Sequence, residues 1–228
     1  MSAKNAKSQK GPTWIEVGLG AVLSLLLGAV LGAAYLVFRP VPTVSATPKD
    51  ASANTVYYIE GGRDIDKTSE LNEKRKEFDS GQSVTVTEGE LNLLLGDDVG
   101  PVPAPVKPGD KPAPPAAKAI DPGPLNARIH DGKIQFGNTV SISVLGISSQ
   151  LVVQATGVFT KHGSKFEFDP ETAYVGGCPV QRFLVLRGWI LNRFLFAHPI
   201  PDDVAAAWPK LIDVHVDGAT LRLRMPQG

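Results

Sequence analysis

The sequence predicts an α+β protein: an N-terminal transmembrane helix, then an antiparallel, curved β-sheet of meander hairpins packed on one long apolar helix. Three features predict this fold class. An uncharged apolar run covers residues 17–38, and a second apolar stretch covers residues 180–197. Between them, residues 125–174 alternate apolar and polar side chains and are interrupted by glycine turns, which is typical of consecutive antiparallel strands.

The apolar run from Val17 to Phe38 is long enough to cross a bilayer. Its 22 residues give about 33 Å of helix at about 1.5 Å per residue, against a hydrocarbon core about 30 Å thick. Three lysines stand in the first ten residues, whereas only Arg39 follows the run closely. Basic residues near a span are retained in the cytoplasm. We therefore expect a single-pass protein of the inner (plasma) membrane, with a cytoplasmic N-terminus and a periplasmic or extracellular C-terminal domain.

A cleaved signal peptide is the alternative to this uncleaved signal-anchor. The small residues Val44-Ser45-Ala46 form an acceptable cleavage site. The apolar part of a signal peptide is about 7–15 residues long, and the run in this chain is longer. The length therefore favours an anchor that stays in place, and both readings export the rest of the chain.

Small residues recur every fourth position in the predicted span. They are Gly20, Ser24, Gly28 and Gly32. This spacing places them on one stripe of the helix and lets a second helix approach closely, which favours a homodimer or a partner membrane helix. The alternative is that glycine and alanine are simply common in membrane helices.

The composition along the chain divides it into four parts and one insertion. Small polar residues and prolines after the apolar run predict an extended linker, and nine prolines near the middle of the chain predict a disordered insertion. The predicted parts are a cytosolic tail at 1–16, the transmembrane helix at 17–38, a linker at 39–56, and an exported α+β domain at 57–228 whose Pro-rich insertion covers 97–124.

Two short helices are expected before the insertion. Residues 64–78 are rich in Glu, Lys and Arg and contain a few apolar anchors, including Ile65, which predicts a solvated helix. A short alternating strand then leads into a second helix, where Thr87 and Glu90 match a capping box. Gly96 stands where a helix commonly ends.

Three turn sequences predict three later hairpins and their registers. Each hairpin is expected to place apolar residues opposite one another. The expected pairs are Ile129 with Ile134 and Ala127 with Phe136 around Asp131-Gly132, Phe159 with Phe166 around His162-Gly163, and Val214 with Leu221 around Asp217-Gly218.

Residues 180–197 predict the strongest helix after the span. Apolar side chains cover a wide face of it and the arginines lie off that face. We therefore expect this helix to be buried along most of its length.

Charge and motif content argue against catalysis and against nucleic-acid binding. The chain carries 23 basic and 23 acidic residues, so no basic patch is available to neutralise phosphates. Cys178 stands alone, which excludes an internal disulfide. Asp213, His215 and Asp217 could face a cation from one strand, but the outward half of an ordinary strand, paired with Arg222, is the preferred explanation of them. We expect a protein that is not an enzyme, with no catalytic residue, cofactor or metal.

The order of the parts resembles a known group of proteins. An N-terminal anchor is followed by a strand leading into Thr-Glu-Gly-Glu-Leu-Asn at 87–92, by Asp-Gly hairpins at 131–132 and 217–218, and by an apolar helix after a Gly-rich, proline-marked turn. This order resembles uncharacterised single-span bacterial membrane proteins whose exported domain is similar to the tubular lipid-binding superfamily. The resemblance covers about residues 84–225 and implies a curved sheet around a long helix, with an acyl chain bound in the groove between them. Asn92 is expected to fix a turn rather than touch a ligand.

Two functions are therefore expected for a membrane-anchored module that is not an enzyme. The first is binding or passing a lipid, with Phe136, Leu151, Val153, Phe159, Phe166, Phe168, Phe183, Trp189 and Phe194 as candidates for the groove. The alternative is a structural or assembly factor of the cell envelope that acts through protein contacts. An apolar interior that is open favours lipid, and one that is filled favours the alternative.

Overall fold

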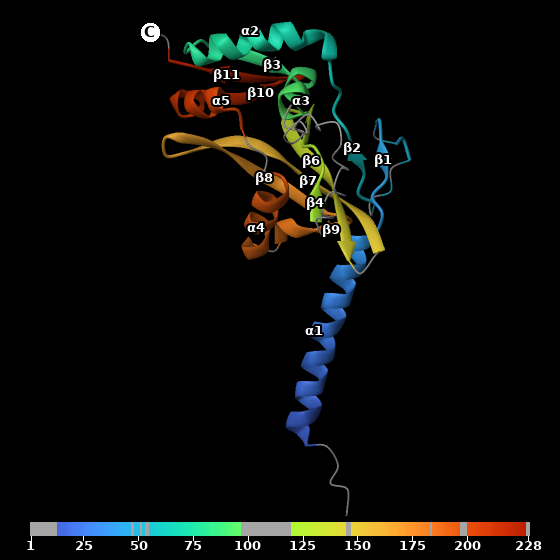
Figure 1. Cartoon of the computed structure of the whole chain (residues 1–228). Helices are drawn as coiled ribbons and strands as arrows, with labels where there is room; N and C mark the ends of the chain where they lie inside the picture. Colours follow the sequence, from blue (N-terminus) through green and yellow to red (C-terminus); the bar gives the residue numbers. More distant parts are fainter. Residues whose placement is uncertain are drawn as a thin grey trace, which may run out of the picture.

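Helix α1, Trp14–Phe38, is a single straight rod that projects from an α+β domain (Figure 1). The computed structural model describes residues 13–46, 48–50, 52, 55–96, 120–144, 147–182, 184–196 and 200–226. Thr13 caps the helix: its hydroxyl accepts from Glu16 N at 3.3 Å, and its own N–H donates to the Glu16 carboxylate at 2.8 Å. The helix thus begins three residues before the predicted span. It is long and apolar enough to cross a membrane.

The last turn of α1 is built into the domain rather than separated from it. Gly177 N donates to Leu36 O at 2.9 Å, and Leu36 and Val37 pack against the main hydrophobic core. Gly176 has a φ of +57°, and a Cβ there would lie 1.9 Å from Val37 O. Only glycine therefore fits this junction.

The predicted linker at 39–56 is partly structured. Strand β1, Thr43–Val44, pairs in parallel with β2, Tyr58–Ile59. Tyr58 N also donates to Pro42 O at 3.0 Å. Backbone pairing therefore holds this part of the linker against the domain, and the predicted bounds of the linker stay a prediction.

The large sheet contains six strands, and those joined by short turns are antiparallel neighbours. The strand order is β4-β6-β7-β8-β9, with β5 also paired to β6. The strands are β4 Ile120–Pro122, β5 Asn126–His130, β6 Lys133–Val144, β7 Ile147–His162, β8 Lys165–Val175 and β9 Cys178–Pro179. Most of the predicted insertion at 97–124 lies outside the described residues, but β4 belongs to the sheet rather than to a disordered segment.

A small sheet and several helices complete the domain. The small sheet has the order β10-β11-β3, and α2 runs beside it (Figure 1). These elements are η1 Ile65–Lys67, α2 Thr68–Asp79, β3 Val84–Thr87, α3 Glu88–Gly96, η2 Val180–Arg182, α4 Leu184–Phe194, α5 Asp202–Ala207, η3 Trp208–Lys210, β10 Asp213–Asp217 and β11 Thr220–Arg224. A bidentate pair from Arg75 to Asp203, at 3.0 and 2.9 Å, joins α2 to α5.

One predicted hairpin register is confirmed and two were wrong. Ile129 faces Ile134 and Ala127 faces Phe136, as expected. Phe159 instead faces Phe168, and Val214 faces Leu223.

Both errors are a slip of two residues with the same cause. In each turn the glycine, Gly163 or Gly218, occupies the first central position with a φ near +60°, as in type II′ turns. The turns expected from the sequence placed the glycine at the second central position. A slip of two keeps every side chain on its predicted face of the sheet.

The helix predicted at 180–197 is shorter than expected. Its first residues form η2, where the Gln181 side chain accepts from Ala173 N of β8 at 3.3 Å and holds this stretch at the sheet edge. Asn138 of β6 donates to Phe194 O at 2.7 Å, where α4 ends.

Trp189 of α4 is 63% exposed, so the prediction that this helix is buried along most of its length was wrong at that position. A curved sheet wrapped around one long helix stays a prediction. Ile65, expected as an anchor of the charged helix, is exposed as well.

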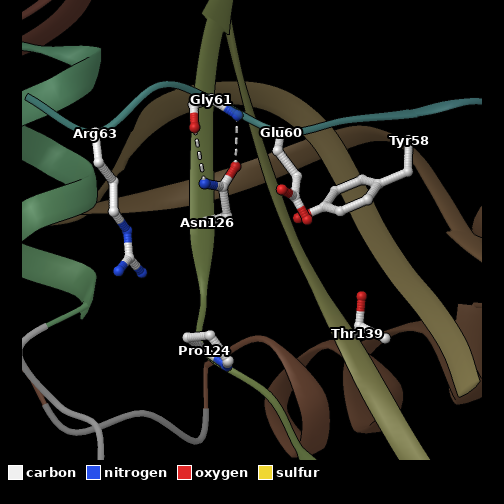
Figure 2. A pocket seen from close by; sticks show the side chains of 7 residues that line it. All are labelled: Tyr58, Glu60, Gly61, Arg63, Pro124, Asn126 and Thr139. Atoms are coloured by element: carbon white, nitrogen blue, oxygen red, sulfur yellow. Dashed lines mark hydrogen bonds between the residues drawn. The ribbon is translucent and has the colours of Figure 1, made fainter. Parts of the chain in front are cut away.

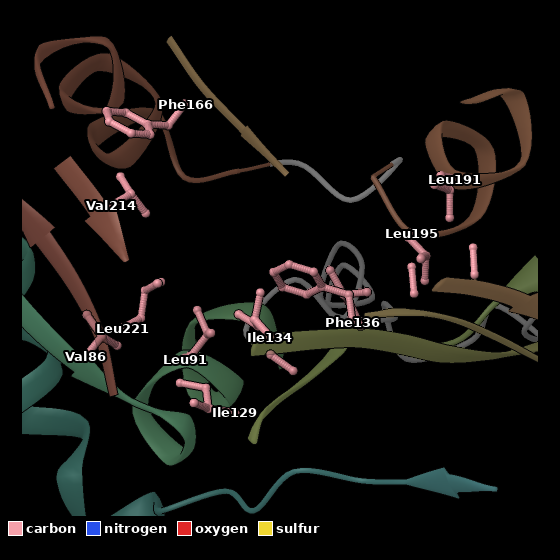
Figure 3. Close-up of a cluster of buried hydrophobic side chains, with 14 of the residues drawn as sticks. Val86, Leu91, Ile129, Ile134, Phe136, Phe166, Leu191, Leu195, Val214 and Leu221 are labelled. Carbon is pink, nitrogen blue, oxygen red and sulfur yellow. The ribbon is translucent and has the colours of Figure 1, made fainter. Parts of the chain in front are cut away.

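One continuous apolar core joins the two sheets (Figure 3). Val86, Leu91, Val214 and Leu221 contribute from the side of the small sheet. Ile134 and Phe136 contribute from the large sheet, Leu191 from α4, and Leu195 from the turn after it. The described part of the domain therefore has a shared interior rather than two separate ones.

We predict that Gly176→Ala loosens the junction between α1 and the domain. The new Cβ combines left-handed backbone strain with a clash against Val37 O, so the free energy of unfolding should fall by about 2–4 kcal/mol. Hydrogen exchange of the Gly177 amide should also lose its protection. Both are measured on the full chain in detergent micelles.

Gly163→Ala is the matched control, since Gly163 has a similar positive φ but open space around it. It should cost about 1–2 kcal/mol from backbone strain alone and leave the Gly177 amide protected. Equal effects of the two substitutions on that amide would contradict the junction.

Candidate functional site

Several of the predicted groove residues meet in an aromatic cluster. Phe136 contacts Phe159 and Phe168 edge to face, with ring centroids 6.4 and 5.1 Å apart. Phe196 and Trp208 extend the cluster, with Trp208 5.5 Å from Phe159. Edge-to-face packing of this kind is a favourable arrangement for aromatic rings. These side chains therefore contact one another, and a groove between them stays a prediction.

The other predicted groove residues are divided among different surroundings. Leu151, Val153 and Phe194 are buried in the main core. Phe166 is buried, and the Lys161 ammonium lies 5.6 Å from the centroid of the Phe166 ring. The Phe166 carbonyl accepts a hydrogen bond from Trp208 Nε1 at 2.9 Å. Trp189 is exposed, and Phe183 lies outside the described residues. Whether any of them contacts a ligand stays a prediction.

Charged and amide side chains line one pocket among the described residues (Figure 2), which we call the polar pocket, although polar and apolar atoms contribute equally to its wall. It encloses about 480 Å³, within the usual range of about 300–1,000 Å³ for ligand sites, and lies where β2 and the chain after it cross β5 and β6. It is lined by Tyr58, Glu60, Gly61, Arg63, Pro124, Asn126 and Thr139.

Close backbone approach builds the wall of this pocket. The Asn126 side chain accepts from Gly61 N at 2.7 Å and donates to Gly61 O at 3.2 Å. A Cβ on Gly61 would lie 2.0 Å from Ala127 O, so this crossing requires glycine. The Tyr58 ring lies against Gly137 of β6, and burial, followed by the nearby Glu60 charge, raises the pKa of Tyr58.

The pocket presents both signs of charge. The Arg63 guanidinium and the Glu60 carboxylate lie on opposite sides of Asn126 (Figure 2). Together with the side chains of Asn126 and Thr139 they offer donors and acceptors to a polar partner. The sequence analysis missed this site. The only local signal was the Gly61-Gly62 pair between charged residues, and Asn126 comes from a distant part of the chain.

The segment Thr87–Asn92, which carried part of the family resemblance, forms hydrogen bonds within itself, to Gly62 and to β5. Its capping box is confirmed: Thr87 N donates to the Glu90 carboxylate at 2.8 Å, and Glu90 N donates to the Thr87 hydroxyl at 3.4 Å. Glu88 accepts from Gly62 N at 2.8 Å and from Ile129 N at 2.7 Å. This segment therefore joins the chain beside the pocket to β5.

Asn92 adds a second connection to β5. It is fully buried, donates to Ala127 O at 2.7 Å and to Gly62 O at 2.9 Å, and accepts from Ala127 N at 2.6 Å. The expectation that Asn92 fixes a turn was therefore wrong, because its hydrogen bonds join segments that are far apart in the chain.

Glu90 is a buried carboxylate with one cationic partner. Its exposed fraction is 0%, and Lys74 Nζ of α2 lies 2.6 Å from its carboxylate oxygen. Burial alone raises the pKa of Glu90, but hydrogen bonds from Lys74 and Thr87 outweigh it and hold the pKa below its usual value. Lys74 of the charged helix therefore has a structural role, in addition to the buried Leu71 and Phe78 of the same helix.

The small-residue stripe of α1 faces away from the rest of the chain. A Cβ on Gly20, Gly28 or Gly32 would meet nothing within 4 Å, and Ser24 is exposed. The stripe is accessible to another helix, and self-association stays a prediction.

The described residues contain no group of three metal-ligating side chains. His215 pairs with Asp213 at 2.9 Å, and Arg222 pairs with Asp217 at 2.7 Å, so the three polar residues of β10 have partners within their own hairpin. Cys178 is buried, and burial raises the pKa of its thiol, which makes it a poor nucleophile. None of these groups lines either described pocket.

Comparison with protein-family models, with curated proteins and with solved structures finds no match to this chain.

We predict that Lys74→Met destabilises the domain by about 2–4 kcal/mol, because it leaves the Glu90 carboxylate buried without its cation. Lys76→Met is the matched control on an exposed position of the same helix and should change the free energy of unfolding by less than about 0.5 kcal/mol. Urea unfolding followed by circular dichroism measures both. Similar values for the two variants would mean that the pair does not stabilise the domain.

The same carboxyl predicts a pH dependence. Because its pKa is lower in the folded chain than its usual value of 4.5, Glu90 stabilises the fold above that value and loses this contribution as the pH falls through the folded pKa. Glu90→Gln should therefore flatten the fall in stability below about pH 4.5. Urea unfolding across acidic pH measures the difference, and parallel curves for the two proteins would contradict it.

Proposed function

We propose that this protein is a membrane-anchored module outside the cytoplasm that acts through protein contacts, as a structural or assembly factor of the cell envelope, without catalysing a reaction. The observation that carries the proposal is the hydrogen bond from Gly177 N to Leu36 O. It joins the end of the apolar helix directly to the domain. A partner bound to the domain is thereby held at the membrane surface.

The character of the described surfaces supports a protein partner. The aromatic rings on the large sheet fill space by contacting one another. Charged side chains line both described pockets, and the second, of about 320 Å³, is lined by Arg75, Lys76, Asp79, Asp203 and Asn72. Mixed charge with hydrogen-bonding groups suits the polar surface of a protein better than an acyl chain. The accessible stripe of α1 offers a further surface for a membrane helix.

Lipid binding is the second candidate, and one observation favours it. Phe196 is 40% exposed, yet its ring lies 6.2 and 5.9 Å from those of Phe136 and Phe168. An apolar path thus leads from the surface to the aromatic cluster. Movement of Phe196 would open that cluster to an acyl chain.

Photo-crosslinking in intact membranes tests the proposal. A photoreactive residue at position 139, which lines the polar pocket, should give adducts of discrete protein mass. Arg63→Ala should reduce them several-fold by removing a pocket cation. A C-terminal reporter enzyme that is active only outside the cytoplasm checks the orientation in the same cells.

Position 85 is the matched control, since Thr85 is an exposed strand threonine on the small sheet. Equal protein adducts at positions 85 and 139 would contradict a specific contact at the pocket. Adducts of lipid mass alone at position 139, together with lipid that co-purifies with the full chain and is lost in Phe196→Ser, would favour the second candidate instead.

A further inference from the structure

We propose that α4 lies in the headgroup region of the same bilayer that α1 crosses, with Trp189 and Arg193 on the face that contacts lipid. The inference rests on the proposed membrane anchoring. It adds a second contact between the domain and the membrane.

Aromatic side chains mark where the membrane surfaces cross α1. Trp14 at one end of the helix is 91% exposed and Tyr35 near the other is 71% exposed. At about 1.5 Å per residue they stand roughly 32 Å apart, close to the hydrocarbon thickness of about 30 Å. Trp and Tyr are enriched at membrane interfaces. The interface on the domain side therefore lies at the level of Tyr35 and Phe38.

The chain that leads into α4 lies at this level. Gly177 N is bonded to Leu36 O, one residue from Tyr35 along the helix. The short elements β9 and η2 follow at once, and α4 begins at Leu184. In Figure 1, α4 lies in the part of the domain nearest the end of α1, whereas α2 and the small sheet lie at the far side. The junction thus places α4 next to the membrane surface.

Two exposed residues of α4 are of the kinds found in interfacial helices. Trp189 and Arg193 are four residues apart and share one face, and both are exposed. Leu191 and Leu195 are buried in the core and lie off that face. Trp189 rests its ring edge-on against Phe194, with centroids 6.3 Å apart. A tryptophan beside an arginine suits the boundary between acyl chains and headgroups.

We propose the bilayer as the partner of the exposed face of α4 because α4 lies close to the end of α1. At about 1.5 Å per residue, α4 is roughly 16 Å long, too short to cross a membrane, and this length agrees with a position along the surface.

Tryptophan quenching in nanodiscs tests this placement. The full chain carrying Trp14→Phe is placed in phosphatidylcholine nanodiscs whose acyl chains are brominated near the headgroup, and its emission is compared with that in unbrominated nanodiscs. Trp189 and Trp208 then remain. Trp208 packs on Phe159 and bonds to Phe166 O. Bromine should remove roughly half of the emission, and the further change Trp189→Phe should abolish that loss.

A second variant separates the failure of this inference from the failure of the anchoring. Trp189→Phe alone retains Trp14 at the opposite end of the span, where bromine should quench it. Quenching of Trp14 without quenching of Trp189 would overturn the placement of α4 and leave the anchoring intact. Absence of quenching at both positions would overturn both. Unchanged circular dichroism of each variant confirms that the exposed Trp189 is not needed for folding.

Discussion

The buried pair between Glu90 and Lys74 is the interaction on which the domain most depends. A carboxylate with no exposed surface is tolerated only when its charge is met by a cation and its oxygens by donors. Lys74 supplies the charge from α2, and Thr87 supplies donors from the end of β3. The pair therefore sets α2, β3 and α3 against one another.

The same short segment carries this constraint to the rest of the molecule. Glu88 and Asn92, on either side of Glu90, bond to the backbone of β5 and to Gly62. β5 in turn is the first strand of the hairpin with β6, and Asn126 at its start fixes Gly61 and the polar pocket. A chain of directional hydrogen bonds thus runs from the interior to the surface that offers polar groups to a partner.

Local signals in the sequence were sufficient where structure is local. The capping box of Thr87 and Glu90 and the Asp131-Gly132 hairpin depend on neighbours within a few residues, and both were predictable. The other two hairpins show the limit of such signals, since a glycine specifies a turn but not its position within it. The short α4 and the pocket depend on Gln181, Asn138 and Asn126 reaching segments far along the chain. No pattern within one segment reveals those contacts.

The junction at Gly176 and Gly177 has a mechanical consequence. The domain and the apolar rod share hydrogen bonding and core packing at this point, and β1 pairs with β2 directly beyond it. The domain and α1 are therefore not joined by a flexible hinge at this point. In the proposed membrane-anchored state, a change in bilayer thickness that tilts α1 would turn the domain with it. The orientation of the polar pocket would then follow the thickness of the bilayer.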